Sequence, residues 1–132
     1  RELRDQLANS PENPDLLLKL ARITLRAGDY NLAKLVLSKA AERVPNNPKV
    51  HNLLGVANWQ LGMPRAAQGA LKTSSEKGSA AGKANLAALY WRYGYAELAQ
   101  GMWSELDMNA LDLTAVDTHP GVDAMVEELG GS

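Results

Sequence analysis

Apolar residues recur along the chain with the three-and-four spacing of amphipathic helices, in several separate stretches. Leu17, Leu20 and Leu25 lie on the first, and Gly28 follows it where a C-terminal glycine cap is expected. A second stretch begins near residue 31 and carries the stripe Ala33, Val36, Leu37, Ala40 and Val44. The Pro-Asn-Asn-Pro sequence of residues 45–48 then forces a turn. The pattern predicts two consecutive helices that fold back on each other as a hairpin.

The same hairpin pattern returns twice further along the chain. Gly28, Gly62 and Gly94 are separated by 34 and then 32 residues. Two further columns keep this spacing, namely Ala33, Ala67 and Ala99, and Leu37, Leu71 and Trp103. A fourth column, again of small residues, consists of Ala21, Gly55 and Ala87, and we expect it to face the alanine column so that paired helices approach closely. A repeated period of this length is typical of helical repeat proteins.

These columns resemble the tetratricopeptide repeat, which has Leu-Gly, Gly, Ala and Pro at fixed intervals. The units offer Leu20-Ala21, Leu54-Gly55 and Leu86-Ala87 for the first pair, although none keeps the family's leading aromatic residue. Only the first unit ends in the expected proline, Pro45. The resemblance implies an all-α fold, a right-handed superhelical stack of antiparallel helix hairpins (an α-solenoid). We expect one domain over 1–132, with repeats at 14–47, 48–79 and 80–110.

Both ends of the chain predict additional elements of the stack. Residues 1–13 end in a Pro-Glu-Asn-Pro motif like that of the first repeat, so we expect them to close a preceding repeat of a longer array. Residues 111–132 are expected to form a loop and a capping helix. That helix would start at Pro120, stop at Gly130 and carry the apolar stripe Val122, Met125, Val126 and Leu129. A repeat stack needs such a cap to cover its last apolar face.

Charge and composition exclude several kinds of partner. The chain has 14 basic and 15 acidic residues and a net charge of -1, which gives no overall attraction to nucleic acid or anionic membrane. No apolar stretch is long enough to insert across a bilayer. Cysteine is absent, which excludes disulfides and thiolate metal sites. The sequence is compatible with both a cytoplasmic and a bacterial periplasmic location.

No motif in the chain predicts catalysis, a cofactor or a metal site. His51 and His119 are the only histidines, and no metal-ligand spacing joins them to carboxylates. We expect His51 to have a packing role. The serines and threonine near residue 74 fit turn and capping roles at a repeat boundary. The Gly82-Lys83 region lacks the order of a phosphate-binding loop, so we expect a protein that is not an enzyme.

The resemblance implies a partner-binding groove on the concave face, which the first helix of each hairpin lines. The residues that it assigns to the groove are Lys19, Arg22, Arg26, Asn52, Val56, Trp59, Gln60, Asn85, Ala88, Trp91 and Arg92. The cationic members favour an acidic peptide or a C-terminal carboxylate. The clamp that holds chaperone tails is not reproduced, and only Asn85 matches an asparagine that holds ligand backbone in the family. Trp59 and Trp91 are as compatible with helix packing as with groove exposure.

The main functional hypothesis is a non-catalytic scaffold that binds a peptide segment of a protein partner in this groove. One alternative is a bacterial envelope protein that assists assembly of a pilus, secretin or motility complex. It rests on a weaker resemblance of residues 52–55 and 85–87 to lipoproteins of that kind. The other alternative is self-association or autoinhibition, in which the stripe of 122–129, or Leu111, Leu113 and Val116, lies in the groove of the same or a neighbouring chain. A regulatory module beside an enzyme is compatible with all three.

Overall fold

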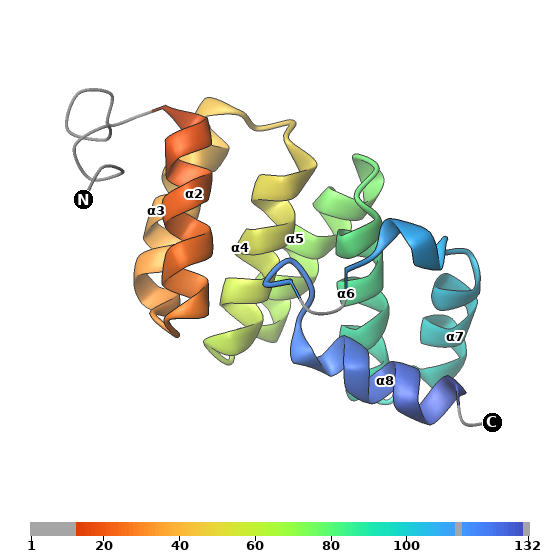
Figure 1. Cartoon of the computed structure of the whole chain (residues 1–132). Helices are drawn as coiled ribbons and strands as arrows, with labels where there is room; N and C mark the ends of the chain where they lie inside the picture. The colour runs from red at the N-terminus through yellow and green to blue at the C-terminus, as the bar shows by residue number, and fades with distance from the viewer. Residues whose placement is uncertain (1–12, 113–114, 131–132) are drawn as a thin grey trace.

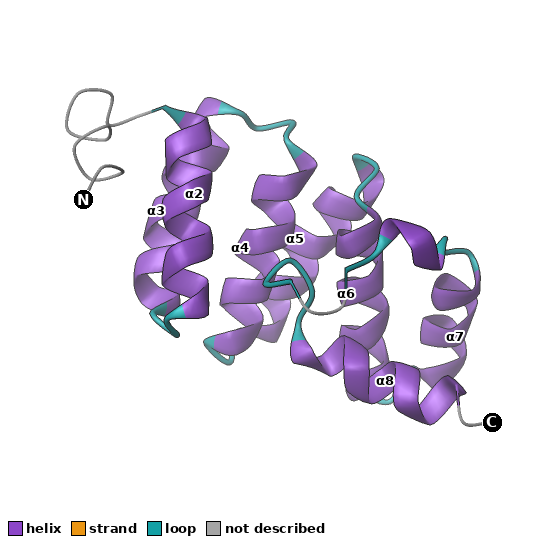
Figure 2. Cartoon of the chain, viewed as in Figure 1, coloured by secondary structure: helices purple, strands orange, loops and turns teal. Residues whose placement is uncertain are grey.

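Helical hairpins make up most of the chain. The computed structural model describes residues 13–112 and 115–130, and within these ranges it contains helices and loops without any strand (Figure 2). The α-helices are α2 (Pro14–Arg26), α3 (Tyr30–Arg43), α4 (Pro48–Gln60), α5 (Pro64–Glu76), α6 (Ala80–Arg92), α7 (Ala96–Ser104) and α8 (Pro120–Gly130). A 3₁₀ helix, η1 (Met108–Ala110), precedes the loop that leads into α8. The leading helix expected over residues 1–13 lies outside the described residues, apart from its last position.

Three hairpins stand side by side, formed by α2 with α3, α4 with α5, and α6 with α7 (Figure 1). The first helices α2, α4 and α6 pack against one another in chain order, and α8 lies against α6 at the C-terminal end of the row. The predicted all-helical stack of hairpins is confirmed.

Asparagine and proline begin two of the first helices. The Asn13 side chain accepts hydrogen bonds from the backbone N–H groups of Asp15 and Leu16, and Pro14 occupies the first helical position. Asn47 and Pro48 start α4 in the same way, with Lys49 N–H as the donor. These side chains satisfy amides that have no partner inside a helix, while proline loses nothing at a position whose N–H is free.

Glycine ends each first helix with the same left-handed turn. Gly28, Gly62 and Gly94 have φ angles of 80°, 73° and 94°, a region that side chains with a Cβ rarely adopt. The residue after each glycine donates its N–H to a carbonyl five residues earlier, as in Asp29 to Thr24 at 2.9 Å. This six-residue closure is the Schellman cap. Its repetition gives the hairpins similar turns.

Small residues bring the two helices of each hairpin together. Ala21, Ala33, Ala67, Ala87 and Ala99 are fully buried. A Cβ added at Gly55 would lie 2.5 Å from the Leu71 side chain, which α5 supplies. The close approach of α4 and α5 therefore depends on glycine at this position, as the repeat pattern predicted.

Helix α8 covers the apolar end of the last hairpin. Val122 and Met125 are 1% and 0% exposed, and they pack in one cluster with Ala84, Ala87 and Ala88 of α6. Trp91 and Trp103 are partly buried against the same cluster. The cap is thus anchored through its apolar stripe. The loop before it is held by polar contacts as well as by the partly buried Leu111 and Val116.

Candidate binding groove

The loop between η1 and α8 crosses the face formed by α2, α4 and α6, where the sequence predicted a partner (Figure 1). We call residues 115–119 the docked segment. It forms a turn, in which the Thr118 N–H donates to the Ala115 carbonyl at 3.2 Å. The Thr118 hydroxyl also lies 3.0 Å from the Asp112 carbonyl, to which it donates, and Thr118 is buried. The turn therefore has a defined shape of its own.

Two buried asparagines hold the main chain of the docked segment. Asn52 and Asn85 are 1% and 0% exposed, and their Nδ2 groups each donate to the Asp117 carbonyl at 2.8 Å. Asn85 Nδ2 also donates to Asn52 Oδ1 at 2.7 Å, and Asn85 Oδ1 accepts from the His119 N–H at 2.8 Å. An amide nitrogen carries two protons, so Asn85 can make both donations. The two amides therefore bind main-chain groups of the segment and make no hydrogen bond to its side chains.

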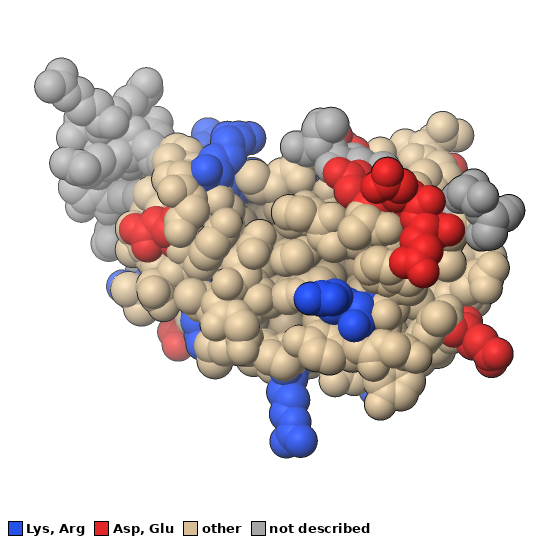
Figure 3. Space-filling view, turned by 90° about the horizontal axis from the view of Figure 1, so that it is seen from below, with Lys and Arg blue, Asp and Glu red and all other residues tan. Residues whose placement is uncertain are grey.

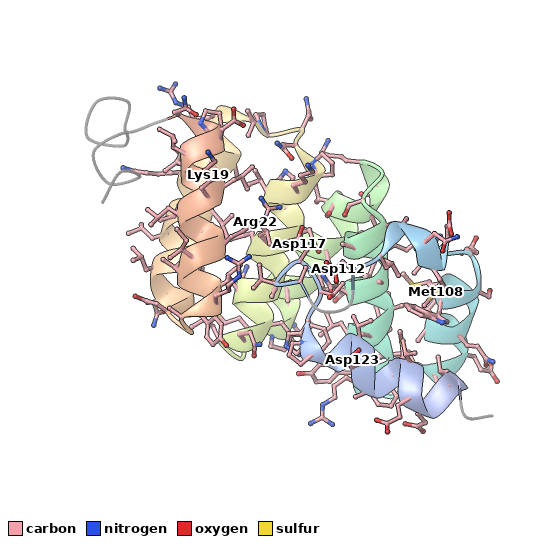
Figure 4. The ribbon with its side chains drawn as sticks, viewed as in Figure 1. Lys19, Arg22, Met108, Asp112, Asp117 and Asp123 are labelled. Carbon is pink, nitrogen blue, oxygen red and sulfur yellow. The ribbon has the colours of Figure 1, made fainter. Side chains whose placement is uncertain are left out.

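Arg22 of α2 binds Asp117, the one acidic side chain of the docked segment. Its Nη2 lies 3.1 Å from Asp117 Oδ2 and its Nε lies 3.3 Å from Oδ1, which is the bidentate arrangement of a guanidinium and a carboxylate. The two side chains are 30% and 31% exposed, so water weakens the pair. Figure 4 shows Arg22 and Asp117 directed toward each other across the space between α2 and the loop. The contact joins residues 95 positions apart.

Trp59 of α4 stacks on His119 at the end of the docked segment. Their ring centroids are 3.5 Å apart and the ring planes differ by 4°. The Gly121 N–H donates to His119 Nδ1 at 2.8 Å, which requires that this nitrogen carry no proton. Burial lowers the pKa of His119 from 6.5 to about 4. His119 is therefore neutral at pH 7 and stacks as an uncharged ring.

The docked segment leaves two open hollows beside it. One, of about 360 Å³, is lined by Arg26, Val56 and Gln60 of the first helices and by Asp123 of α8, among others. The other, of about 290 Å³, has Arg22 and Arg26 on one side and Asp112 and Asp117 on the other. Acidic groups of the C-terminal region thus line the same hollows as the arginines that were expected to attract an acidic partner.

Seven of the residues assigned to the groove from sequence meet on this face, and one of them, Gln60, lines the larger hollow. Arg22, Asn52, Asn85 and Trp59 contact the docked segment, and Arg26 and Val56 line the larger hollow. Lys19 is exposed on α2 and is not among the residues that line either hollow (Figure 4).

The last repeat corrects the predicted groove. Ala88 is 0% exposed and belongs to the cluster under α8, so the surface expected of it does not exist in this structure. Trp91 packs partly buried against the same cluster. Arg92 is exposed at the end of α6 and lines neither hollow. The reason is α8, whose apolar stripe covers the part of α6 that the family pattern would leave open.

Sequence reasoning missed the contacts of Asp117, Thr118 and His119. It considered this loop as a groove occupant through Leu111, Leu113 and Val116. Leu113 lies outside the described residues, while Leu111 and Val116 are only partly buried against the core clusters. The available signal was the match between acidic residues at 112, 117 and 123 and the arginines of α2.

The described parts of the chain bear on two further kinds of site: clusters of metal-ligating side chains and membrane-spanning helices. No cluster of three or more potential ligand side chains is placed to hold a metal ion there. The helices of residues 13–112 and 115–130 include none that combines the length and apolarity needed to cross a bilayer. His51, half-buried on α4, instead contacts the Pro45 carbonyl through its Nε2 at 2.6 Å.

Comparison with known proteins identifies the repeat. Residues 1–57 match the family model of the tetratricopeptide repeat. No curated protein matches the chain. Among solved structures, MamA AMB-1 is 28% identical with a TM-score of 0.66, over 78% of this chain and 62% of its own. MamA MSR-1 is 22% identical with a TM-score of 0.64, over 96% of this chain and 65% of its own.

The chain therefore spans less than two thirds of the MamA chains that it matches. The likeness to MamA MSR-1 shows the shared fold alone. The resemblance to envelope lipoproteins gains no support from these comparisons. The repeat match over residues 1–57, the hairpin stack and the likeness to MamA AMB-1 together show that the chain is similar to tetratricopeptide repeat proteins.

Proposed function

We propose that the chain is a non-catalytic scaffold that captures a short, non-helical segment of a partner protein on the face of α2, α4 and α6. The fold is one that serves protein–protein interaction in general. The observation that carries the proposal is the pair of buried asparagines, whose amides bind the Asp117 carbonyl and the His119 N–H. Every peptide offers those main-chain groups, so the face is suited to polypeptide rather than to a small molecule.

Charge supports an acidic partner segment. Arg22 and Arg26 line the hollows, and the acidic side chains opposite them belong to the loop and α8 rather than to the first helices. An arginine fork binds a carboxylate with two hydrogen bonds, which fixes direction as well as position. A role in envelope complex assembly rests on the sequence resemblance alone and stays a prediction.

A peptide library selected on the chain tests the proposal. The selection uses Asp117→Ala, because this change frees Arg22 from its internal partner. The best peptides are then titrated against two double variants. Both carry Asp117→Ala, and the second change is either Arg22→Ala in the groove or Lys39→Ala on the exposed side of α3. We expect Arg22→Ala to weaken binding about tenfold, as for loss of a charge-assisted pair, and Lys39→Ala to leave it unchanged.

Backbone hydrogen exchange of the complex provides the second readout. The proposal expects protection of α4, α6 and α2 by the bound peptide. Peptides that bind equally to both variants and protect α3 and α5 instead would overturn it.

A further inference from the structure

We infer that the docked segment is a built-in pseudo-ligand, and that the partner presents the same features: a turn with an acidic residue followed two positions later by a planar ring. The inference rests on the proposed function and names the partner chemistry of the same face. Asp117 and His119 supply the two side chains, and the main chain between them supplies the rest.

Each first helix contributes a different part of the recognition. Arg22 of α2 binds the carboxylate, Trp59 of α4 stacks on the ring, and Asn85 of α6 binds backbone on both sides of Thr118. The three contacts are spaced along a short stretch of chain, so a ligand must present them in order. A segment with only one of them would leave buried amides or the arginine without a partner, which is costly.

The docked segment is held by contacts that can be exchanged. Its attachments are hydrogen bonds to the amides of Asn52 and Asn85, a partly exposed ion pair, one ring stack and the partly buried side chain of Val116. By contrast, Val122 and Met125 keep α8 in the core. The loop can therefore leave the face while α8 remains in place. A competing peptide can remake hydrogen bonds to the two amides, whereas nothing in such a peptide replaces the apolar side chains that α8 buries.

The hollows give a partner room to bind better than the docked segment does. They extend beside residues 115–118 for about 360 Å³ and 290 Å³. Arg26 lines both of them. A longer acidic segment that repeats the contacts of Asp117 and His119 gains additional area and charge there. This gain lets it displace an internal competitor.

A peptide of residues 112–121, acetylated and amidated, tests the inference. It is titrated calorimetrically into the wild-type chain and into the Asp117→Ala/His119→Ala variant, whose own segment has lost both side-chain contacts. We expect the peptide to bind the variant at least about tenfold more tightly. In the wild-type chain the docked segment occupies the site, and the apparent affinity is reduced in proportion to the fraction of molecules whose site is open. A variant that detaches the docked segment is called a releasing variant. Gly121→Ala, which crowds Trp59 and His119, is a second releasing variant, used if the first has a lowered midpoint of thermal unfolding by circular dichroism.

Altered peptides test the recognition pattern. Replacing the aspartate by asparagine, or the histidine by alanine, is expected to weaken binding to the releasing variant by about threefold to tenfold each. Replacing the histidine by tyrosine is expected to retain most of the binding, because the ring still stacks. Equal affinity for wild type and both releasing variants, or no binding to any of them, overturns the inference.

The oligomeric state separates a partner from a second copy. If wild type forms a concentration-dependent dimer in light scattering and the peptide dissociates it, the occupant is another copy of the chain and a separate partner is excluded.

The pseudo-ligand inference can fail while the proposed scaffold function holds. Library peptides that bind through Arg22 but lack the acidic and ring pattern leave the scaffold intact and refute the pseudo-ligand.

Discussion

At the residue scale, equivalent positions in successive repeats have different roles. Trp59 and Trp91 both lie three residues before a capping glycine, yet Trp59 stacks on His119 and Trp91 packs against the cluster under α8. Asn85 was assigned to backbone binding through the family resemblance, and its amide does contact backbone, although of the same chain. The sequence could not distinguish the two tryptophans, because their neighbours come from residues far along the chain.

Acid is expected to release the docked segment. The pKa of His119 is about 4 when it is buried against Trp59 and 6.5 when it is free. The released state therefore binds a proton more readily, so the contribution of the neutral His119 ring to docking is fully present above pH 6.5 and is lost as the pH falls toward 4. The charged groups lining the same region are Arg22, Arg26, Asp117 and Asp123.

Proton NMR of the His119 ring measures this release. We expect its signals to titrate well below those of a free histidine and to move toward random-coil positions in acid. The signals are assigned with the His51→Gln variant. Titration near pH 6.5 with unchanged ring shifts would contradict the buried, stacked state.

Gly121→Ala is expected to separate Trp59 from His119. A Cβ at this position would lie 2.7 Å from the Trp59 ring and 3.0 Å from His119 Nδ1. The near-ultraviolet circular dichroism of the tryptophans should fall while far-ultraviolet helicity is retained. Gly101→Ala on α7 is the matched control, because nothing lies within 4 Å of its added Cβ. A tryptophan spectrum altered equally by both changes would disprove the close approach.

At the element scale, the sequence predicted what depends on local chemistry. The capping glycines, the proline starts and the small-residue columns each act within one helix or between neighbours in a hairpin, so a repeat pattern reveals them. The turn of residues 115–119 depends on hydrogen bonds to Asn52 and Asn85, more than 30 residues away. Nothing in its own sequence specifies these partners, which is why hydrophobic residues alone suggested its placement.

Gly55→Ala tests the packing of the second hairpin. Its methyl group would lie 2.5 Å from Leu71, a fully buried side chain, so the free energy of unfolding should fall by about 1–3 kcal/mol. Gly69→Ala on α5 has open space around the added group and should raise stability by up to about 1 kcal/mol through helix propensity. Urea unfolding followed by circular dichroism measures both, and equal effects would contradict the helix contact.

At the scale of the whole molecule, the C-terminal region both caps the stack and covers its binding face. Figure 3 shows acidic side chains gathered at the end where α8 lies, with basic side chains mostly apart from them. The exposed Asp123, Glu127 and Glu128 belong to α8. This face therefore carries a local excess of acidic side chains, although the charge of the whole chain is almost balanced. The acidic residues of the loop and α8 line the same hollows as Arg22 and Arg26.

Exchanging the charges of Arg22 and Asp117 tests the ion pair that joins α2 to the docked segment. Arg22→Glu and Asp117→Arg should each loosen the docked segment, and the double variant should recover part of the loss. We expect a coupling energy of about 0.5–1 kcal/mol, since the pair is partly exposed. Thermal unfolding of the four chains gives the coupling. If the effects of the two single changes on the free energy of unfolding simply add in the double variant, the ion pair contributes nothing to stability.

The most direct measurement of the central claim observes the docked segment while a ligand binds. Isotope-labelled wild-type chain is mixed with excess unlabelled peptide of residues 112–121, so that only the chain's own His119 ring is visible. We expect this ring to lose the shift caused by Trp59 as the peptide takes its place on α4 and α6. A peptide that binds while the chain's own His119 stays stacked on Trp59 would show that ligand and docked segment do not share the site.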